Sequence, residues 1–122
     1  MLHLNSIMLG SENPKALADF YEKVLEKTPD MVEGDWYGFS AGSCFLSIGL
    51  HDKVAGKSTN PERIILNFET ETVQAEFERL QELGSTVIKA PYSMGEGDDV
   101  AQIATLADPD GNYFQLMTPW ES

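Results

Sequence analysis

Phe45-Leu46-Ser47-Ile48 and Tyr113-Phe114-Gln115-Leu116 share one pattern at an offset of 68 residues, with a polar residue third among bulky apolar ones. An earlier part of the chain repeats at an offset of 57 residues, which aligns Ser6, Ala18 and Phe20 with Arg63, Ala75 and Phe77. The second copy therefore holds about eleven extra residues between its helix and its last strand. Such repetition predicts two copies of one supersecondary unit, neither of which buries its apolar face alone.

The first copy reads as a strand, a helix and three more strands. Asn13 is expected to cap the helix and Pro14 to take its first position, where a missing N–H costs nothing. Apolar residues then recur at helical spacing and form one stripe: Leu17, Phe20, Tyr21, Val24 and Leu25. Alternating apolar and polar residues, interrupted by Gly and Pro where strands end, predict strands at residues 2–9, 30–33, 36–41 and 43–50.

The second copy repeats this order. A strand is expected at residues 63–68, and a helix at 72–83 that ends before Gly84. The remaining strands are expected at residues 86–89, 100–106 and 113–118.

The length predicts a single domain over residues 1–122, built from modules 1–50 and 62–122 that are joined by the polar linker 51–61. Pro, Gly and acidic residues over 90–99 predict a loop outside the sheet. Asp108-Pro109-Asp110-Gly111-Asn112 predicts a tight turn between the last two strands.

The composition narrows the function classes. Twenty acidic and eight basic residues give a net charge of −12, which opposes binding to nucleic acid or anionic membrane and favours a cationic small molecule. No long apolar run and no basic-then-apolar leader stands out, so we expect neither a membrane span nor a secretion signal. The single Cys44 has no disulfide partner in the chain, which favours a reduced, cytoplasmic setting.

Strand alternation separates residues that face the helices from residues that face away. The helix-facing set is apolar: Ile7, Leu9, Leu46, Ile48, Leu50, Ile64, Leu66, Phe68, Phe114 and Leu116. The opposite set mixes polar, aromatic and thioether side chains: Leu4, Ser6, Met8, Phe45, Ser47, Gly49, Arg63, Ile65, Asn67, Tyr113, Gln115 and Met117. This second set forms either a solvated sheet face or a concave small-molecule site, and its aromatics and thioethers favour the site.

Two motifs add a resemblance to a known family. Asn13-Pro14-Lys15-Ala16-Leu17-Ala18-Asp19-Phe20-Tyr21 follows the first strand, and Asp108-Pro109-Asp110-Gly111-Asn112 precedes the last. With its paired modules, the chain resembles the vicinal oxygen chelate superfamily, which includes glyoxalase I, extradiol dioxygenases, and fosfomycin and bleomycin resistance proteins. The resemblance implies an α+β fold of two βαβββ modules, with curled mixed sheets around a cleft and helices on the outer face. It also implies a homodimer.

Catalytic members of that superfamily hold a divalent metal with four side chains from the first and last strands of both modules. The matching positions carry Ser6, Ser47, Arg63 and Gln115. Two hydroxyls, a guanidinium and an amide offer no anionic ligand. His3 falls on the other strand face from Ser6, and His51 lies four residues beyond Ser47. We therefore expect no metal and no cofactor.

The candidate ligand-binding residues are the polar residues of this face and the bulky side chains near them: Ser6, Met8, Trp36, Phe45, Ser47, Arg63, Tyr92, Tyr113, Gln115 and Met117. Arg63 either meets an anionic group of the ligand or reaches solvent past Glu62. The loop at 90–99 also carries Met94, and its acids Glu96, Asp98 and Asp99 are expected to attract cations.

These features favour a metal-free protein of the bleomycin-resistance kind that binds a small organic molecule, with drugs among the candidates. Two alternatives stay open. One is a glyoxalase-type lyase, isomerase or dioxygenase with an altered or absent metal site, and the other is a non-catalytic interaction or regulatory module. The expected partners are the small molecule and a second copy of the chain, without nucleic acid or membrane.

Overall fold

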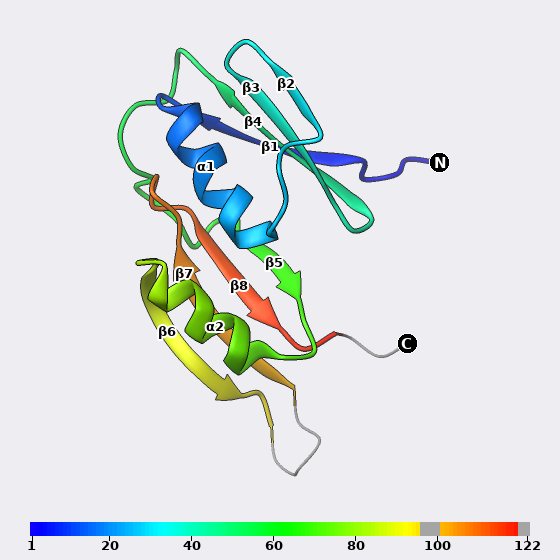
Figure 1. The fold of residues 1–122 in the computed structure, drawn as a ribbon, viewed down its shortest axis with the longest axis vertical. Helices are drawn as coiled ribbons and strands as arrows, with labels where there is room; N and C mark the ends of the chain where they lie inside the picture. Colours follow the sequence, from blue (N-terminus) through cyan, green and yellow to red (C-terminus); the bar gives the residue numbers. More distant parts are fainter. Residues whose placement is uncertain (96–100, 120–122) are drawn as a thin grey trace. The chain divides into compact units, whose positions relative to one another are not determined.

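The structure is a computed structural model that describes residues 1–95 and 101–119. The chain divides into two compact units, Met1–Lys57 and Ser58–Ser122, and each has its own sheet and its own helix (Figure 1). In the part of the chain that the structure describes, no helix is long and apolar enough to cross a membrane.

The first unit is a four-stranded mixed sheet with one helix. Its elements are β1 (Ser6–Ser11), α1 (Pro14–Leu25), β2 (Met31–Glu33), β3 (Trp36–Ala41) and β4 (Cys44–Leu50). The strand order is β1-β4-β3-β2, with β1 parallel to β4 and the other pairs antiparallel. The helix α1 contacts β1, β3 and β4 and covers one face of this sheet (Figure 1).

The second unit repeats the same topology. Its elements are β5 (Leu66–Glu69), α2 (Val73–Glu82), β6 (Thr86–Ser93), β7 (Gln102–Ala107) and β8 (Tyr113–Met117). The order is β5-β8-β7-β6, with β5 parallel to β8 and the other pairs antiparallel. The helix α2 contacts β6, β7 and β8. The two units confirm the predicted α+β class and the two βαβββ modules, and neither sheet closes on itself.

Side chains ahead of α1 fix its start at the predicted residue. The Asn13 side chain accepts a hydrogen bond from the Ala16 backbone N–H at 3.4 Å, and Pro14 takes the first helical position. The Ser11 hydroxyl accepts a hydrogen bond from the Asn13 backbone N–H at 3.0 Å. These contacts turn the chain from the end of β1 directly onto its own sheet.

Each helix packs against the apolar face of its own sheet. The largest fully buried side chains are Leu17, Tyr21, Phe39 and Ile48 in the first unit, and Leu80, Leu106 and Phe114 in the second. Within the predicted helix-facing set, most residues are buried or half-buried, as expected: Leu46, Ile48, Leu66, Phe114 and Leu116 are buried, and Ile7, Leu9 and Phe68 are half-buried. Leu50 and Ile64 are exceptions, 55% and 71% exposed, because one ends β4 and the other precedes β5.

Three predicted strand boundaries are wrong by three residues or more. The first strand begins at Ser6 instead of residue 2, and β5 begins at Leu66 instead of residue 63. Alternation of side chains overestimates these strands, because a strand extends only as far as its partner, and the partners begin at Cys44 and Tyr113. In contrast, β6 runs to Ser93, four residues past its predicted end.

The structural repeat has an offset of 59 across β1 and α1, where the sequence pattern predicts 57. The Thr70 hydroxyl accepts a hydrogen bond from the Thr72 N–H at 3.1 Å, which reproduces the Ser11 and Asn13 contact 59 residues earlier. The same offset relates three pairs of buried helix residues: Pro14 and Val73, Ala18 and Phe77, and Tyr21 and Leu80. The second copy therefore gains nine residues before its last strand instead of eleven.

The turn before β8 forms as predicted. The Asp108 carboxylate is 5% exposed and accepts hydrogen bonds from the backbone N–H groups of Asp110 and Asn112, both at 2.9 Å. Gly111 has a φ of 78°, a conformation that favours glycine. This turn sets where β8 begins, and so sets the position of Tyr113 and Gln115.

Candidate functional site

In the first unit, five of the predicted site residues lie on the sheet face opposite α1. Strand pairing places Ser6 beside Phe45 and Met8 beside Ser47. Trp36 pairs with Gly49, two residues beyond Ser47, and so shares this face. Ser47 is 7% exposed, whereas Met8 is 53% exposed. The structure therefore brings these residues together around one buried hydroxyl.

Two glycines create the shape of this face. A methyl group added at Gly38 would lie 2.4 Å from Phe45 Cζ and 3.0 Å from Trp36 Cη2, and one added at Gly49 would lie 3.1 Å from Met8 Cε. The Trp36 and Phe45 rings stack with centroids 6.2 Å apart and planes inclined by 25°. Both rings are half-buried. We call the three side chains Met8, Trp36 and Phe45 over these glycines the aromatic platform.

In the second unit, four predicted site residues lie on the sheet face opposite α2. Tyr113, Gln115 and Met117 alternate along β8 with buried residues that face the helix. The Gln115 amide nitrogen donates a hydrogen bond to the Thr105 hydroxyl at 3.1 Å. Tyr92, from β6, pairs with Ile103 and is 39% exposed. Tyr92 was expected in a loop, and its place in the sheet corrects that expectation.

Arg63 does not occupy the strand position that the sequence pattern predicts. It is exposed and lies in the turn before β5. Ser6 pairs with Phe45, and continuing the β5 and β8 register by one residue puts Ile65 opposite Tyr113, the counterpart of Phe45. Arg63 thus lies two residues ahead of the position equivalent to Ser6, and its role toward a ligand stays a prediction.

In the connection between β6 and β7, the structure describes residues 94, 95 and 101. Met94 is 55% exposed, directly after the strand. The acids Glu96, Asp98 and Asp99, which were expected to attract cations, lie outside the described residues.

The residues at the superfamily's metal positions do not fit a divalent cation. Ser47 and Gln115 are neutral, and the Gln115 amide nitrogen already donates to Thr105. Ser6 is exposed, and the equivalent position of the second unit carries Ile65, which offers no ligand atom. Arg63 carries a positive charge outside the strand. Within residues 1–95 and 101–119, no three His, Cys, Asp or Glu side chains gather where they could hold a metal. No chemical step is therefore assigned to a metal here.

Sequence patterns missed Lys89 and Thr105 on this face of the second unit. Lys89 pairs with Thr105, and its ammonium lies 4.1 Å from the centroid of the Tyr92 ring. The pairing of β6 with β7 shifts register between Val87 and Lys89 and again between Lys89 and Tyr92. Simple alternation places residues three apart on opposite faces, so it gives no signal for this pair.

Comparison with known proteins gives the family. The sequence matches the model of the glyoxalase-like domain over residues 6–117. The chain belongs to this family, within the vicinal oxygen chelate superfamily that the sequence motifs resemble. No curated protein sequence matches the chain.

Solved structures share the fold along nearly the whole chain. A glyoxalase-related enzyme from Fulvimarina pelagi has a TM-score of 0.76 and 18% identity, covering 98% of this chain and 89% of its own. A glyoxalase/bleomycin resistance protein/dioxygenase family enzyme from Burkholderia phytofirmans PsJN has a TM-score of 0.75 and 21% identity, covering 96% and 98%. A glyoxalase/bleomycin resistance protein from Albidiferax ferrireducens T118 has a TM-score of 0.71 and 19% identity, covering 94% and 98%. Identities this low show the fold alone.

Proposed function

We propose that this chain binds a small organic molecule on the sheet faces opposite its helices, without a catalytic metal or other cofactor. The ligand class includes planar, drug-like molecules. In this proposal the protein is a homodimer in the cytoplasm. Its function is to bind the molecule, without catalysing a reaction.

The observation that carries the proposal is the aromatic platform. Aromatic rings bury a large apolar area and bind flat partners by offset stacking, worth about 0.5–1.5 kcal/mol beyond the area term. Trp36 and Phe45 are half-buried, and Gly38 and Gly49 leave room for both rings to lie close to the sheet. Met8, 53% exposed beside them, adds a side chain that adapts to irregular ligands. These features suit the flat, apolar part of a ligand.

Polar groups on each of the two faces would orient a bound molecule. In the first unit, Ser6 and Ser47 supply hydroxyls beside the platform. On the face of the second unit, Gln115 supplies an amide, Tyr92, Tyr113 and Met117 add apolar contact area, and Arg63, in the exposed turn before β5, meets an anionic group.

The test is a screen of planar aromatic compounds followed by tryptophan fluorescence. The chain holds two tryptophans, so a Trp120→Phe background leaves Trp36 as the reporter. Binding should change Trp36 fluorescence saturably, and a compound at 100 times its dissociation constant should stabilise the fold by about 2.7 kcal/mol.

Two variants of the first unit locate the site. The added methyl group in Gly38→Ala meets the Phe45 ring and must displace it, so affinity should fall by about tenfold or more. Thr28→Ala, at an exposed position between α1 and β2 and outside the platform, should leave affinity unchanged. Equal affinity of Gly38→Ala and the parent for every bound compound would contradict a site on the platform.

A further inference from the structure

Four polar side chains form a row across the sheet of the second unit. Asn67 of β5 pairs with Gln115 of β8, Gln115 pairs with Thr105 of β7, and Thr105 pairs with Lys89 of β6. Residues that pair directly across a sheet point to the same face. We call these four residues the polar row, and it lies on the face opposite α2.

Two register shifts in β6 bring Lys89 into the row. They lie on either side of Lys89, so that Lys89 pairs with Thr105 while Tyr92, three residues later, pairs with Ile103. In a regular strand these two side chains would point to opposite faces. Here the Lys89 ammonium lies 4.1 Å from the Tyr92 ring centroid, so both point to the same side. Bulges that re-aim side chains recur next to binding sites.

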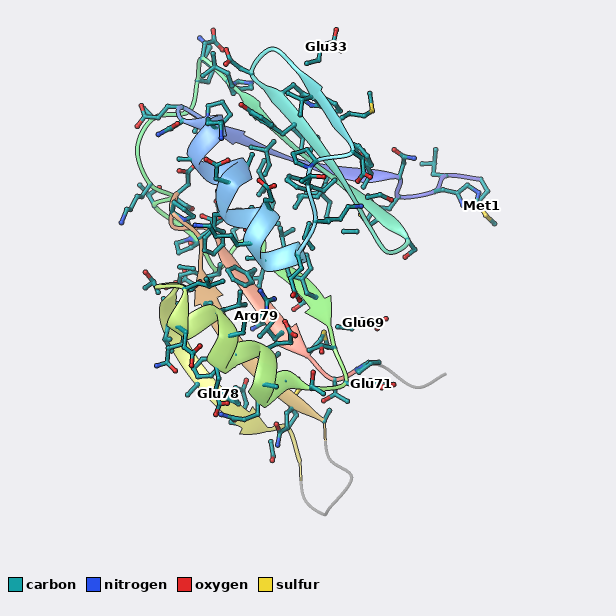
Figure 2. All side chains as sticks on the ribbon, viewed as in Figure 1. Met1, Glu33, Glu69, Glu71, Glu78 and Arg79 are labelled. Carbon is teal, nitrogen blue, oxygen red and sulfur yellow. The ribbon has the colours of Figure 1, made fainter. Side chains whose placement is uncertain are left out.

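Within the described residues, Lys89 is a cation without an acidic partner, although the chain is strongly acidic. Among residues 1–95 and 101–119, no carboxylate lies within ion-pair distance of Lys89, whereas Lys15, Lys27 and Arg79 each have one. Among the described strand residues of the second unit, the acid that shares this face is Glu69, on the opposite edge strand, three strand spacings or at least roughly 14 Å away. Figure 2 shows its side chain extending outward from that edge.

The hydroxyl of Thr105 is oriented by its neighbour. Because the Gln115 amide nitrogen donates to the Thr105 oxygen at 3.1 Å, the hydroxyl hydrogen is left to donate elsewhere. Thr105 is 7% exposed, so this hydrogen bond is shielded from water. Lys89, which pairs with Thr105 across the sheet, carries an ammonium with up to three more donors.

We propose that the polar row binds an oxyanion, a carboxylate or a phosphate group, with Lys89 and Thr105 as its donors. This inference rests on the proposed function, in which the sheet face of the second unit also binds ligand, and adds the chemical class that this face selects. Tyr92 holds the ammonium over its ring, which reduces the loss of side-chain freedom on binding.

The features of β6 also suit a second role. It is an edge strand, and a lysine together with bulges prevents an edge from pairing with another chain. Edge protection does not require the hydrogen bond between Gln115 and Thr105, so the experiment must separate oxyanion binding from self-association.

The experiment is an amide NMR titration of the full chain with benzoate, phenyl phosphate and the neutral analogue benzamide. At least one anion should shift the signals of Lys89, Thr105 and Gln115 saturably, and the tighter anion identifies the group as carboxylate or phosphate. Benzamide should bind more weakly. Lys89→Met should weaken anion binding by about three- to tenfold, a modest loss because Lys89 is exposed.

Two variants serve as controls. Lys89→Arg should retain most of the anion affinity because the charge and donors remain. Lys53→Met removes the same charge from another exposed position and should change affinity little. Unchanged anion affinity in Lys89→Met would overturn the inference, whether or not the variant self-associates. So would an equal loss in Lys53→Met.

The two proposals fail in different ways. If all three probes bind with equal affinity at a site reported by Trp36, the inference on the polar row is wrong and the proposed function stands. If neither these probes nor the aromatic screen gives saturable binding, the proposed function fails as well.

Discussion

At Gly38, the lack of a side chain decides what β3 presents to a ligand. The residue types of the platform are visible in the sequence, and alternation placed Met8, Phe45 and Ser47 on the correct face. The part played by Gly38 and Gly49 was not predictable, because only the structure shows which rings fill the space where their Cβ atoms would lie. The alternation of residues in the sequence thus predicts on which sheet face a residue lies, whereas side-chain packing decides the shape of that face.

Asp30 provides a test at a single carboxylate. Its pKa is held below the ordinary value of 3.8, first by the hydrogen bond from Lys27 and then by the backbone N–H of Ser40. The Asp30 oxygen lies 2.7 Å from the Lys27 ammonium nitrogen and 2.6 Å from the Ser40 nitrogen. A carboxyl whose pKa is lower in the folded state than in the unfolded state stabilises the fold at pH values above its unfolded-state pKa. This stabilisation disappears as the pH falls through the folded-state pKa.

An NMR titration of the side-chain carboxyl carbons should therefore give Asp30 a pKa below 3.8. Lys27→Met should raise that pKa part of the way back, because the Ser40 hydrogen bond remains. Lys53→Met should leave it unchanged. A pKa at or above the ordinary value in the parent chain would show that the contact with Lys27 does not persist in solution.

At the scale of elements, helices were easier to predict than strand ends. Capping and the apolar stripe set α1 from Pro14 to Leu25. Strand ends depend on the length of a partner far along the chain, which is why β1 and β5 both begin later than alternation suggests. The bulges of β6 depend in the same way on pairing with β7, so sequence alone could not place Lys89 beside Tyr92.

The two helix starts offer a matched comparison. The Asn13 side chain accepts a hydrogen bond from the Ala16 N–H, whereas Thr72, at the equivalent position of α2, makes no side-chain cap hydrogen bond. Asn13→Ala should lower the free energy of unfolding by about 1 kcal/mol. Thr72→Ala should lower it by clearly less. Chemical denaturation of the two variants measures both values, and equal losses would argue against the cap at Asn13.

At the scale of the whole molecule, the paired modules and the family were predictable, because the repeat and two motifs span the chain. Function was less accessible. The metal positions of the superfamily carry residues unsuited to metal, and these residues do not identify a ligand.

The assembly is expected to be a homodimer. Each unit leaves its sheet open, and the edge strand β2 exposes Met31 and Val32 by 51% and 60%. Open edges with apolar residues favour pairing with a second copy. Light scattering should give twice the chain mass of 13.5 kDa at micromolar concentration. A monomer mass across a wide concentration range would rule the dimer out.

The central claim is that the chain binds organic ligands without a metal. The most direct measurement is the affinity of the tightest compound from the aromatic screen. The compound is titrated into protein that has been dialysed against a chelator, and again after addition of Zn²⁺, Mn²⁺ or Ni²⁺. Elemental analysis gives the metal content of each sample. We predict less than one tenth of a metal ion per chain after dialysis and the same affinity in every sample, because Ser6, Ser47, Arg63 and Gln115 supply no anionic ligand. Close to one metal ion retained per chain, or binding that appears only when metal is added, would contradict the account.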